Sequence, residues 1–174
     1  MKQKLLILLM VGLVIGCSTT KTTTLISDDY NQEKNVTTLT ILPHGHIVIP
    51  GKWTKTSYNE VSRQHFFVNE DSITIAVAKN PQDKYPFYQE SMTDQEFVRK
   101  FYEWDSEYYE KQGFEIKENT IGDNYVVWTV SGKGAHTTFL FGGKDKYAYN
   151  IAVFTEQWTE EKRIEFLKSL FEGN

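Results

Sequence analysis

Short apolar runs separated by turn-forming residues fill the chain beyond residue 35, and they predict two groups of β-strands. Within each run the apolar residues alternate with polar ones or are β-branched, and Gly, Pro, Asn or Asp stands between neighbouring runs. This pattern is typical of antiparallel strands joined by hairpins. The predicted strands are residues 36–42, 46–49, 64–68 and 73–78 in the first group, and 114–121, 125–131, 136–141 and 147–154 in the second.

Two segments instead carry the periodicity of a helix. Thr93 followed by Glu96 has the spacing of a capping box, in which each side chain satisfies a backbone N–H at the start of a helix. Large aromatic residues then recur at intervals of four, three and four, which places them on one stripe: Phe97, Phe101, Trp104 and Tyr108. We therefore expect a helix over residues 94–112, ended by Gly113, and a second one over residues 160–171.

The order of hairpins, helix, meander and helix predicts an α+β domain. We expect an antiparallel sheet of about six to eight strands with helices on its faces, an α/β/α sandwich. Short motifs at residues 50–53 (Pro-Gly-Lys-Trp), 113–115 (Gly-Phe-Glu), 149–151 (Tyr-Asn-Ile) and 167–171 (Leu-Lys-Ser-Leu-Phe) stand at matching places in this order. On these motifs the domain resembles the PsbP/Mog1-like fold. That resemblance implies a non-catalytic binding or assembly role and assigns no functional residue, and the strand at 36–42 departs from the family pattern.

The N-terminus has the pattern of an export signal. Lys2 and Lys4 precede an uncharged apolar stretch over residues 5–15, which is shorter than the roughly 20 residues that a membrane-spanning helix needs. The stretch ends in Val-Ile-Gly-Cys at residues 14–17, and this quartet resembles the bacterial lipobox, in which the cysteine is acylated and becomes the first mature residue. The alternatives are an ordinary signal peptide or a buried apolar helix.

This interpretation divides the chain into a lipoprotein signal peptide (1–16), a flexible tether (17–35) and a single α+β domain (36–174). The tether is expected because residues 18–35 are mostly Thr, Ser, Lys, Asp and Asn, which bury little apolar surface. Lipidation at Cys17 makes the bilayer a partner. Ser18 resembles the residue type that directs lipoproteins to the outer membrane, and we expect the periplasmic face there.

Composition narrows the list of partners and cofactors. The net charge is −4 and falls further if Lys2 and Lys4 leave with the signal, so we expect no binding to nucleic acid. Cys17 is the only cysteine, so an acylated chain has no free thiol and no disulfide. With 40% hydrophobic residues, the domain has enough apolar side chains to fold around its own core.

No motif in the sequence points to catalysis, a metal or another cofactor. The glycine-rich segments at 132–134 and 142–144 lack the residues of a phosphate-binding loop and have the composition of hairpin turns. His44 and His46 could share a metal with His65 or His136, but His44 lies in a Pro-His-Gly turn where solvated histidines are the commoner case. Acidic residues on the long helix lie opposite Phe101, as expected of a solvated face: Glu103, Glu107 and Glu110.

The loop over residues 80–92 is the candidate binding segment. It is longer than most connections in compact domains and carries Tyr85, Phe87 and Tyr88, residue types that dominate contact surfaces. These three rings either form a binding surface or fold down to close one end of the sheet.

Three functions remain open from the sequence. The first is an envelope lipoprotein that binds a protein partner in assembly or protection, without catalysis, through the aromatic loop or a sheet edge. The second is an immunity protein that neutralises a toxin directed at the envelope. The third is a hydrolase whose catalytic residues are dispersed along the chain.

The lipoprotein interpretation predicts that Cys17→Ser leaves the domain folded but removes the anchor. Membrane fractionation and incorporation of labelled fatty acid should both be lost, because no other cysteine can be acylated. Unchanged membrane partition of the variant would show that the anchor lies elsewhere.

Overall fold

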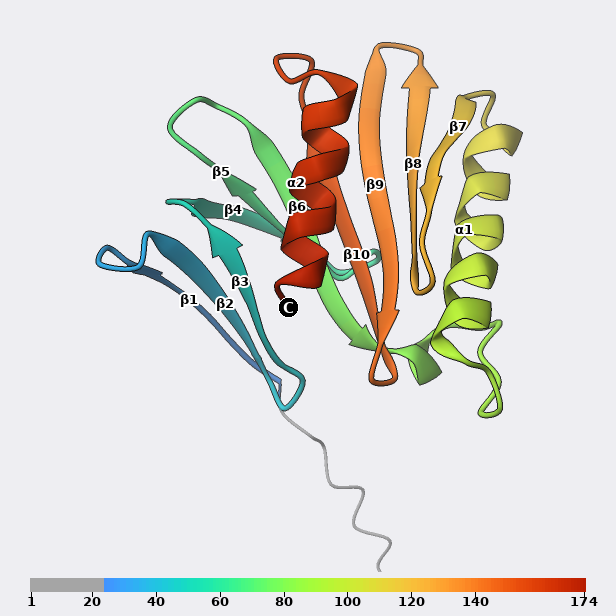
Figure 1. The fold of residues 1–174 in the computed structure, drawn as a ribbon, viewed down its shortest axis with the longest axis horizontal. Helices are drawn as coiled ribbons and strands as arrows, with labels where there is room; N and C mark the ends of the chain where they lie inside the picture. The colour runs from blue at the N-terminus through green and yellow to red at the C-terminus, as the bar shows by residue number, and fades with distance from the viewer. Residues whose placement is uncertain (1–23) are drawn as a thin grey trace, which may run out of the picture.

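Ten β-strands and two α-helices make up residues 24–174, the part of the chain that the computed structural model describes (Figure 1). In chain order the strands are β1 (Leu25–Asn31), β2 (Val36–Leu42), β3 (Gly45–Pro50), β4 (Thr54–Asn59), β5 (Gln64–Val68), β6 (Thr74–Pro81), β7 (Glu115–Ile121), β8 (Tyr125–Gly132), β9 (Ala135–Lys144) and β10 (Tyr147–Phe154). The helices are α1 (Asp94–Lys111) and α2 (Glu160–Glu172), with a 3-10 turn, η1 (Gln82–Lys84), between β6 and α1. None of the helices in this range is long and apolar enough to cross a membrane.

The strands form one large and one small antiparallel sheet. The large sheet has the order β4-β5-β6-β10-β9-β8-β7, and the small one has the order β1-β2-β3. Pairing of β6 with β10 joins the first group of strands to the second. The α+β class with an antiparallel sheet flanked by helices, as predicted from the sequence, is thus confirmed.

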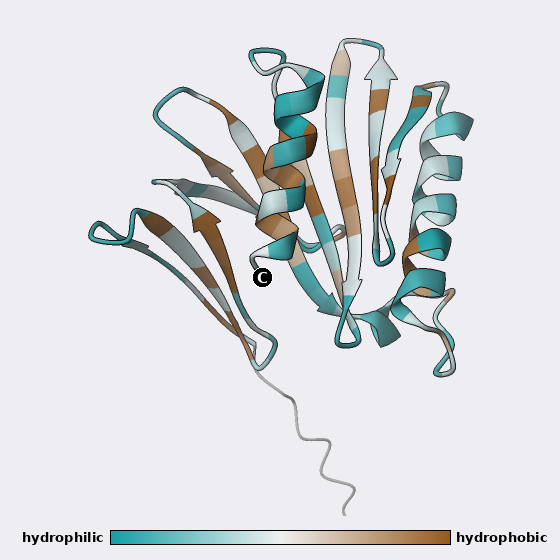
Figure 2. Ribbon diagram, viewed as in Figure 1, coloured by the Kyte–Doolittle hydropathy of each residue, from teal (hydrophilic) through white to brown (hydrophobic). Residues whose placement is uncertain are grey.

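The helices lie on opposite faces of the large sheet. Helix α1 begins with the predicted capping box, in which the Thr93 hydroxyl accepts from the Glu96 N–H and the Glu96 carboxylate accepts from the Thr93 N–H. Its apolar stripe packs on β8 and β9, where the ring of Phe101 stacks on Phe141 at 3.9 Å between centroids. Helix α2 packs through Leu167, Leu170 and Phe171 on the other face. Figure 2 shows the hydrophilic residues on the outer sides of the helices.

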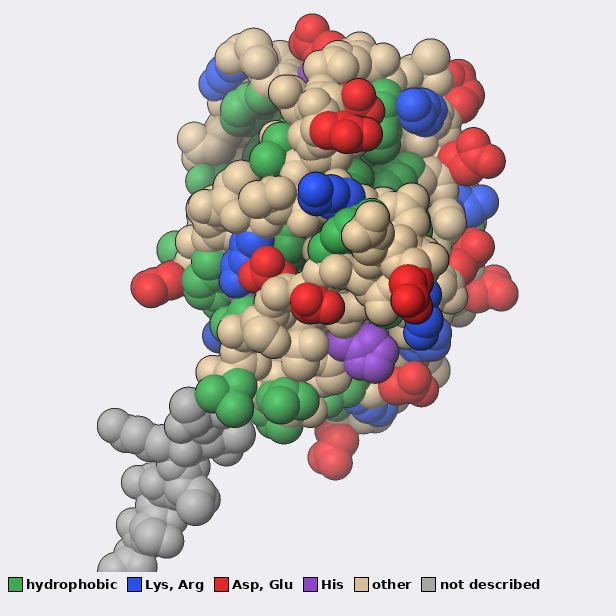
Figure 3. Space-filling model, turned by 90° about the vertical axis from the view of Figure 1, so that its left-hand side faces the viewer, with side chains coloured by type: hydrophobic (Ala, Val, Ile, Leu, Met, Phe, Trp, Pro, Cys, Tyr) green, Lys and Arg blue, Asp and Glu red, His purple; other side chains and the backbone are tan. Residues whose placement is uncertain are grey.

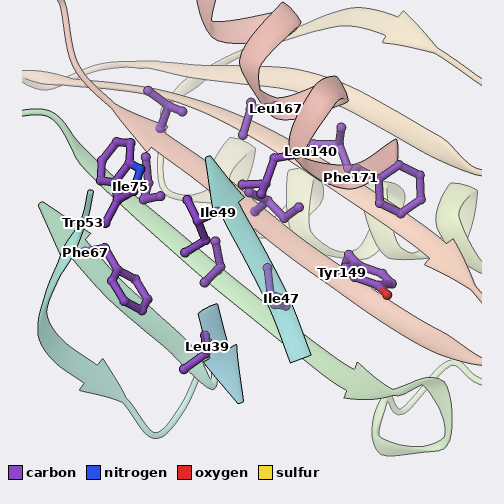
Figure 4. Packing of buried hydrophobic residues seen from close by; sticks show 14 of the residues in the cluster. Leu39, Ile47, Ile49, Trp53, Phe67, Ile75, Leu140, Tyr149, Leu167 and Phe171 are labelled. Atoms are coloured by element: carbon purple, nitrogen blue, oxygen red, sulfur yellow. The ribbon is translucent and has the colours of Figure 1, made fainter. Parts of the chain in front are cut away.

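The small sheet packs beside α2 and completes the second apolar core. Figure 4 shows its side chains pointing at the large sheet. They are Leu39, Ile47 and Ile49, which meet Phe67, Ile75 and Trp53 in one buried cluster. Beside α2, the free edge of β3 is paired with a side chain, because the Asn174 amide accepts from the Val48 N–H at 2.7 Å and donates to the Val48 carbonyl at 3.0 Å.

Two strands differ from the sequence prediction. Residues 25–31 form β1, so the expectation of a flexible tether through residue 35 is wrong for this stretch, and residues 17–23 lie outside the described range. All side chains of β1 except Tyr30 are exposed, and the strand is held by its backbone ladder to β2. Strand β4 is similarly polar and pairs only with β5. Neither strand needs the apolar alternation by which the other strands were predicted.

Charged side chains of both signs are interspersed on the face of the molecule drawn in Figure 3, which shows no extended basic patch. Surface ion pairs of the domain include Arg99 with Glu118 at 2.8 Å and Lys117 with Glu160 at 2.6 Å. Such pairs contribute little to stability individually. The fold is therefore held by its two apolar cores.

The close contact between β9 and α2 yields a test of this packing. A Cβ atom on Gly142 would lie 2.3 Å from Cε2 of Phe171, so Gly142→Ala should lower the free energy of unfolding by about 1–3 kcal/mol through overpacking. Urea denaturation measures the change. The double variant Gly142→Ala/Phe171→Leu should melt closer to the wild type, because it removes the clashing ring. The control double variant Gly142→Ala/Leu167→Met keeps that ring and should melt lower.

Candidate binding cleft

Helix α1 leaves part of its own side of the large sheet uncovered. The helix packs over the bulky residues of β8 and β9, whereas β6 and β10 present small residues on that side, such as Ala76 and Ala152. The result is a cleft of about 630 Å³ between α1, the β4–β5 turn and the segment after β6. Clefts of roughly 300–1,000 Å³ are typical of ligand sites.

Two buried amides form the floor of this cleft. Gln64 Nε2 on β5 donates to Asn150 Oδ1 on β10 at 2.9 Å. The side chains meet above β6 because the residue between them, Ala78, is small. No hydrogen bond among residues 24–174 uses Gln64 Oε1 or Asn150 Nδ2, so the floor offers one acceptor and one donor to a ligand.

The loop rings that the sequence singled out pack against α1. Tyr85, Phe87 and Tyr88 are half-buried and belong to the core on the α1 side. The ring centroids of Tyr85 and Phe101 are 4.6 Å apart, and those of Phe87 and Trp104 are 5.7 Å apart. The rings therefore lie over the apolar side of α1, and Tyr85 also lines the cleft. Whether they bind a partner stays a prediction.

Exposed apolar side chains surround the mouth of the cleft. Val61 is 95% exposed, Tyr108 59% and Trp104 48%, and all three line the cleft. Trp104 and Tyr108 were predicted to lie on the apolar stripe of the helix, and they do, but at its uncovered end. Large aromatic side chains exposed beside a concave site are typical of contact surfaces.

Asp105 is the acidic residue among those that line the cleft. It lies one helical turn after Phe101, and no hydrogen bond or ion pair in the described part of the chain involves its carboxyl group. Burial raises the pKa of Asp105 to about 6. The sequence reasoning missed this residue, although a charged side chain four positions after a buried aromatic residue is a readable signal.

The hydroxyl groups around Asp105 remain protonated at neutral pH. Burial raises the pKa of Tyr85 and that of Tyr109 to about 12 each. The charges of Arg63 and Asp105 also act on the Tyr85 hydroxyl, where the first lowers and the second raises its pKa. Tyr85 thus lies within reach of opposite charges from the β4–β5 turn and from α1.

The other residues considered for chemistry lie apart from the cleft. His65 is buried between the two sheets. Burial, and to a smaller extent the positive charge of Lys55, lowers the pKa of His65 to about 4. His136 is 2.7 Å from the Arg163 guanidinium, and His44 packs on the edge of Tyr147. Within residues 24–174 no three His, Cys, Asp or Glu side chains are placed to hold a metal ion.

The acidic face of α1 is solvated, as the sequence predicted. Glu103 pairs with Lys100 at 3.2 Å and Glu107 with Lys111 at 2.6 Å, and Glu110 is exposed beside them. Asp105 differs from all three of these residues in being partly buried, and from Glu103 and Glu107 also in having no cationic partner among the described residues.

The chain matches no known protein-family model, and no curated protein is similar to it in sequence.

The raised pKa of Asp105 makes a prediction about stability. An unfolded aspartate titrates near 3.8 and the folded one near 6, so the folded state binds the proton more tightly. The Asp105 contribution to the free energy of unfolding accordingly falls as the pH rises from about 4 to about 6. Asp105→Asn should raise the free energy of unfolding by about 1–3 kcal/mol above pH 7 and by much less below pH 4.

Urea denaturation across this pH range checks the prediction. Glu103→Gln is the matched control on the same helix, because its carboxyl group is exposed and paired. An equal gain in the two variants would show that net charge, and not burial of Asp105, is responsible.

Proposed function

We propose that the chain is a lipid-anchored protein of the bacterial cell envelope, whose α+β domain is a non-enzymatic module that binds a protein partner at the cleft. The observation that carries this proposal is the coincidence of exposed apolar side chains, Val61, Trp104 and Tyr108, with the mouth of a cleft that has polar groups inside. Partners commonly insert one side chain into such a cleft while the aromatic rim excludes water.

The position of the rim on a helix favours binding. Trp104 and Tyr108 project from α1, which is fixed to the sheet by Phe97 and Phe101. Side chains on a rigid element lose less conformational freedom on association than side chains on a mobile loop. The loop rings Tyr85, Phe87 and Tyr88 pack against the same helix and help to hold it in position. Tyr85 also lines the cleft and can contact a partner directly.

The proposed anchor holds the domain close to the membrane. If Cys17 is acylated, residues 18–24 connect it to β1, and a stretch of this length reaches about 25 Å at most. The expected tether of residues 17–35 would have allowed more than twice that reach. We place the module on the periplasmic side of the outer membrane, where the partner would be another envelope protein.

We also propose kinship with the PsbP/Mog1-like fold. It is supported by the antiparallel sheet with α1 and α2 on opposite faces and by the positions of the shared motifs. Residues 50–53 lead from β3 into β4, and residues 113–115 lead from α1 into β7. Strand β2, which forms a second sheet with β1 and β3, is the departure from that pattern.

A hydrolase is the second candidate, and the feature in its favour is the partly buried carboxyl group of Asp105 in the cleft, where burial raises its pKa to about 6. A carboxyl group that titrates near neutrality can act as a general acid or base. Hydrolysis of a glycosidic bond, however, usually takes two carboxyl groups, and the residues lining the cleft include one. Binding is therefore the better-supported function.

Photo-crosslinking tests the proposed site. A photoreactive amino acid in place of Tyr108 should crosslink the full-length, membrane-anchored protein to a specific partner, and Val61→Ser with Trp104→Ala should reduce the yield at least about tenfold because two anchors are lost. The same amino acid in place of Ile121, which is 51% exposed at the end of the edge strand β7, is the control and should give no specific product.

The identity of the crosslinked partner separates the open functions. An envelope protein of the same cell supports the assembly or protection role, and a foreign toxin supports the immunity role. Turnover of an envelope substrate that is abolished by Asp105→Asn, with no crosslink from position 108, would support the hydrolase and contradict the proposal.

A further inference from the structure

We propose that the cleft receives an organic cation, an ammonium or guanidinium group on an apolar stem such as a lysine or arginine side chain of the partner, and that Asp105 is its counter-ion. This inference rests on the proposed function, because it specifies the chemistry of the group that the partner inserts. It follows from three features of the cleft, which are the unpaired carboxyl group, the aromatic walls and the location of the nearby cations.

The first feature is the isolation of the Asp105 carboxyl group. It lines the cleft and has no ion pair or hydrogen bond among the described residues, while its neighbours Glu103 and Glu107 are both paired with lysines. An unpaired carboxylate in a partly buried site is unfavourable. A cationic ligand would form an ion pair with this carboxylate, whereas an anionic ligand would add electrostatic repulsion.

The second feature is the set of rings around this carboxyl group. The aromatic residues lining the cleft are Tyr85, Phe101, Trp104, Tyr108, Tyr109 and Phe139. Ring faces attract ammonium and guanidinium groups through their quadrupoles, and their apolar surface packs against the methylene stem of such a side chain. A site made of one carboxylate and several rings is thus complementary to a cation with a stem.

The third feature is the placement of the protein's own cations. Lys84 lines the cleft but is paired with Asp83 at 3.3 Å. Arg63 also lines the cleft, from the β4–β5 turn, where its side chain is exposed, and no ion pair joins it to Asp105 in the described part of the chain. Neither cation therefore neutralises Asp105.

The floor adds a polar contact for the atoms that accompany the cation. Gln64 Oε1 is an acceptor and Asn150 Nδ2 a donor on two lining residues that are hydrogen-bonded to each other, and a peptide group carries a donor and an acceptor that could pair with them. The shared chemistry is a cation, but it could be supplied by a side chain or by the amino terminus of a polypeptide. The two sources are separated by the choice of probe.

The test is a titration of the full chain in detergent micelles with small probes. Nα-acetyl-lysine-N-methylamide carries only the side-chain ammonium group, and leucinamide carries only a terminal one. Binding is followed by NMR at the indole N–H of Trp104, assigned with Trp104→Phe; the indoles of Trp53, Trp128 and Trp158, which do not line the cleft, serve as internal references.

The lysine probe should shift the Trp104 resonance in a saturable way. The Nε-acetylated lysine probe, which has the same stem without the charge, should bind at least about tenfold more weakly, as should the lysine probe to Asp105→Asn. Glu103→Gln should bind like the wild type. Binding should also weaken below about pH 6, where Asp105 becomes protonated. If leucinamide binds more tightly than the lysine probe, the cleft still binds a cation, but the cation is the amino terminus of a polypeptide.

Two results would overturn the inference. One is equal affinity for the lysine probe and its Nε-acetylated form, and the other is the absence of any shift at Trp104 with either cationic probe. Each leaves the proposed function standing if position 108 still crosslinks to a partner. If the probes bind as expected but no partner is crosslinked, the cation site stands and the protein-binding function fails.

Discussion

The antiparallel ladder between β6 and β10 is the constraint on which the rest of the molecule depends. It joins two groups of strands that are separated by the whole of α1 and thereby makes one sheet of them. On the α1 side, β6 and β10 carry mostly small side chains, such as Ala76, Ala148 and Ala152, which offer little apolar surface for a helix to pack on. The large rings lie instead on β8 and β9, where Trp128, Phe139 and Phe141 take up the apolar stripe of α1. The distribution of side-chain size across the sheet thus places the helix on one half and leaves the cleft on the other.

For this reason the two faces of the large sheet are covered to different extents. On the α2 face the central apolar residues, such as Phe67, Ile75 and Tyr149, are buried beneath α2 and the β1–β3 sheet. On the α1 face the covering ends at Trp104 and Tyr108, and polar groups appear below them. Buried amides such as Gln64 and Asn150 are tolerated because each satisfies the other in part. A surface of this kind is costly for a domain that only needs to fold.

Asp105 shows the same conflict in a single residue. A carboxyl group without a partner in a partly buried position lowers the stability of the folded state at neutral pH, and an asparagine of the same shape would avoid that loss. Residues that are unfavourable for folding and lie in a cleft are candidates for function. A cationic ligand would supply the ion pair that the Asp105 carboxylate lacks in the free protein.

Elements whose signals are local were predictable from the amino-acid sequence. The capping box at Thr93, the stripe of α1 and the alternation of β2, β5 and β10 were all readable, because caps and amphipathic periods depend on residues a few positions apart. The tertiary structure alone decided β1 and β4, which are polar edge strands held by backbone ladders, and it alone made the cleft. Gln64 and Asn150 are 86 residues apart, and the cleft that Asp105 lines also takes Tyr85 and Phe139 from other segments. Local patterns carry no information about which distant side chains will meet, since that follows from strand order and from which half of the sheet is bulky.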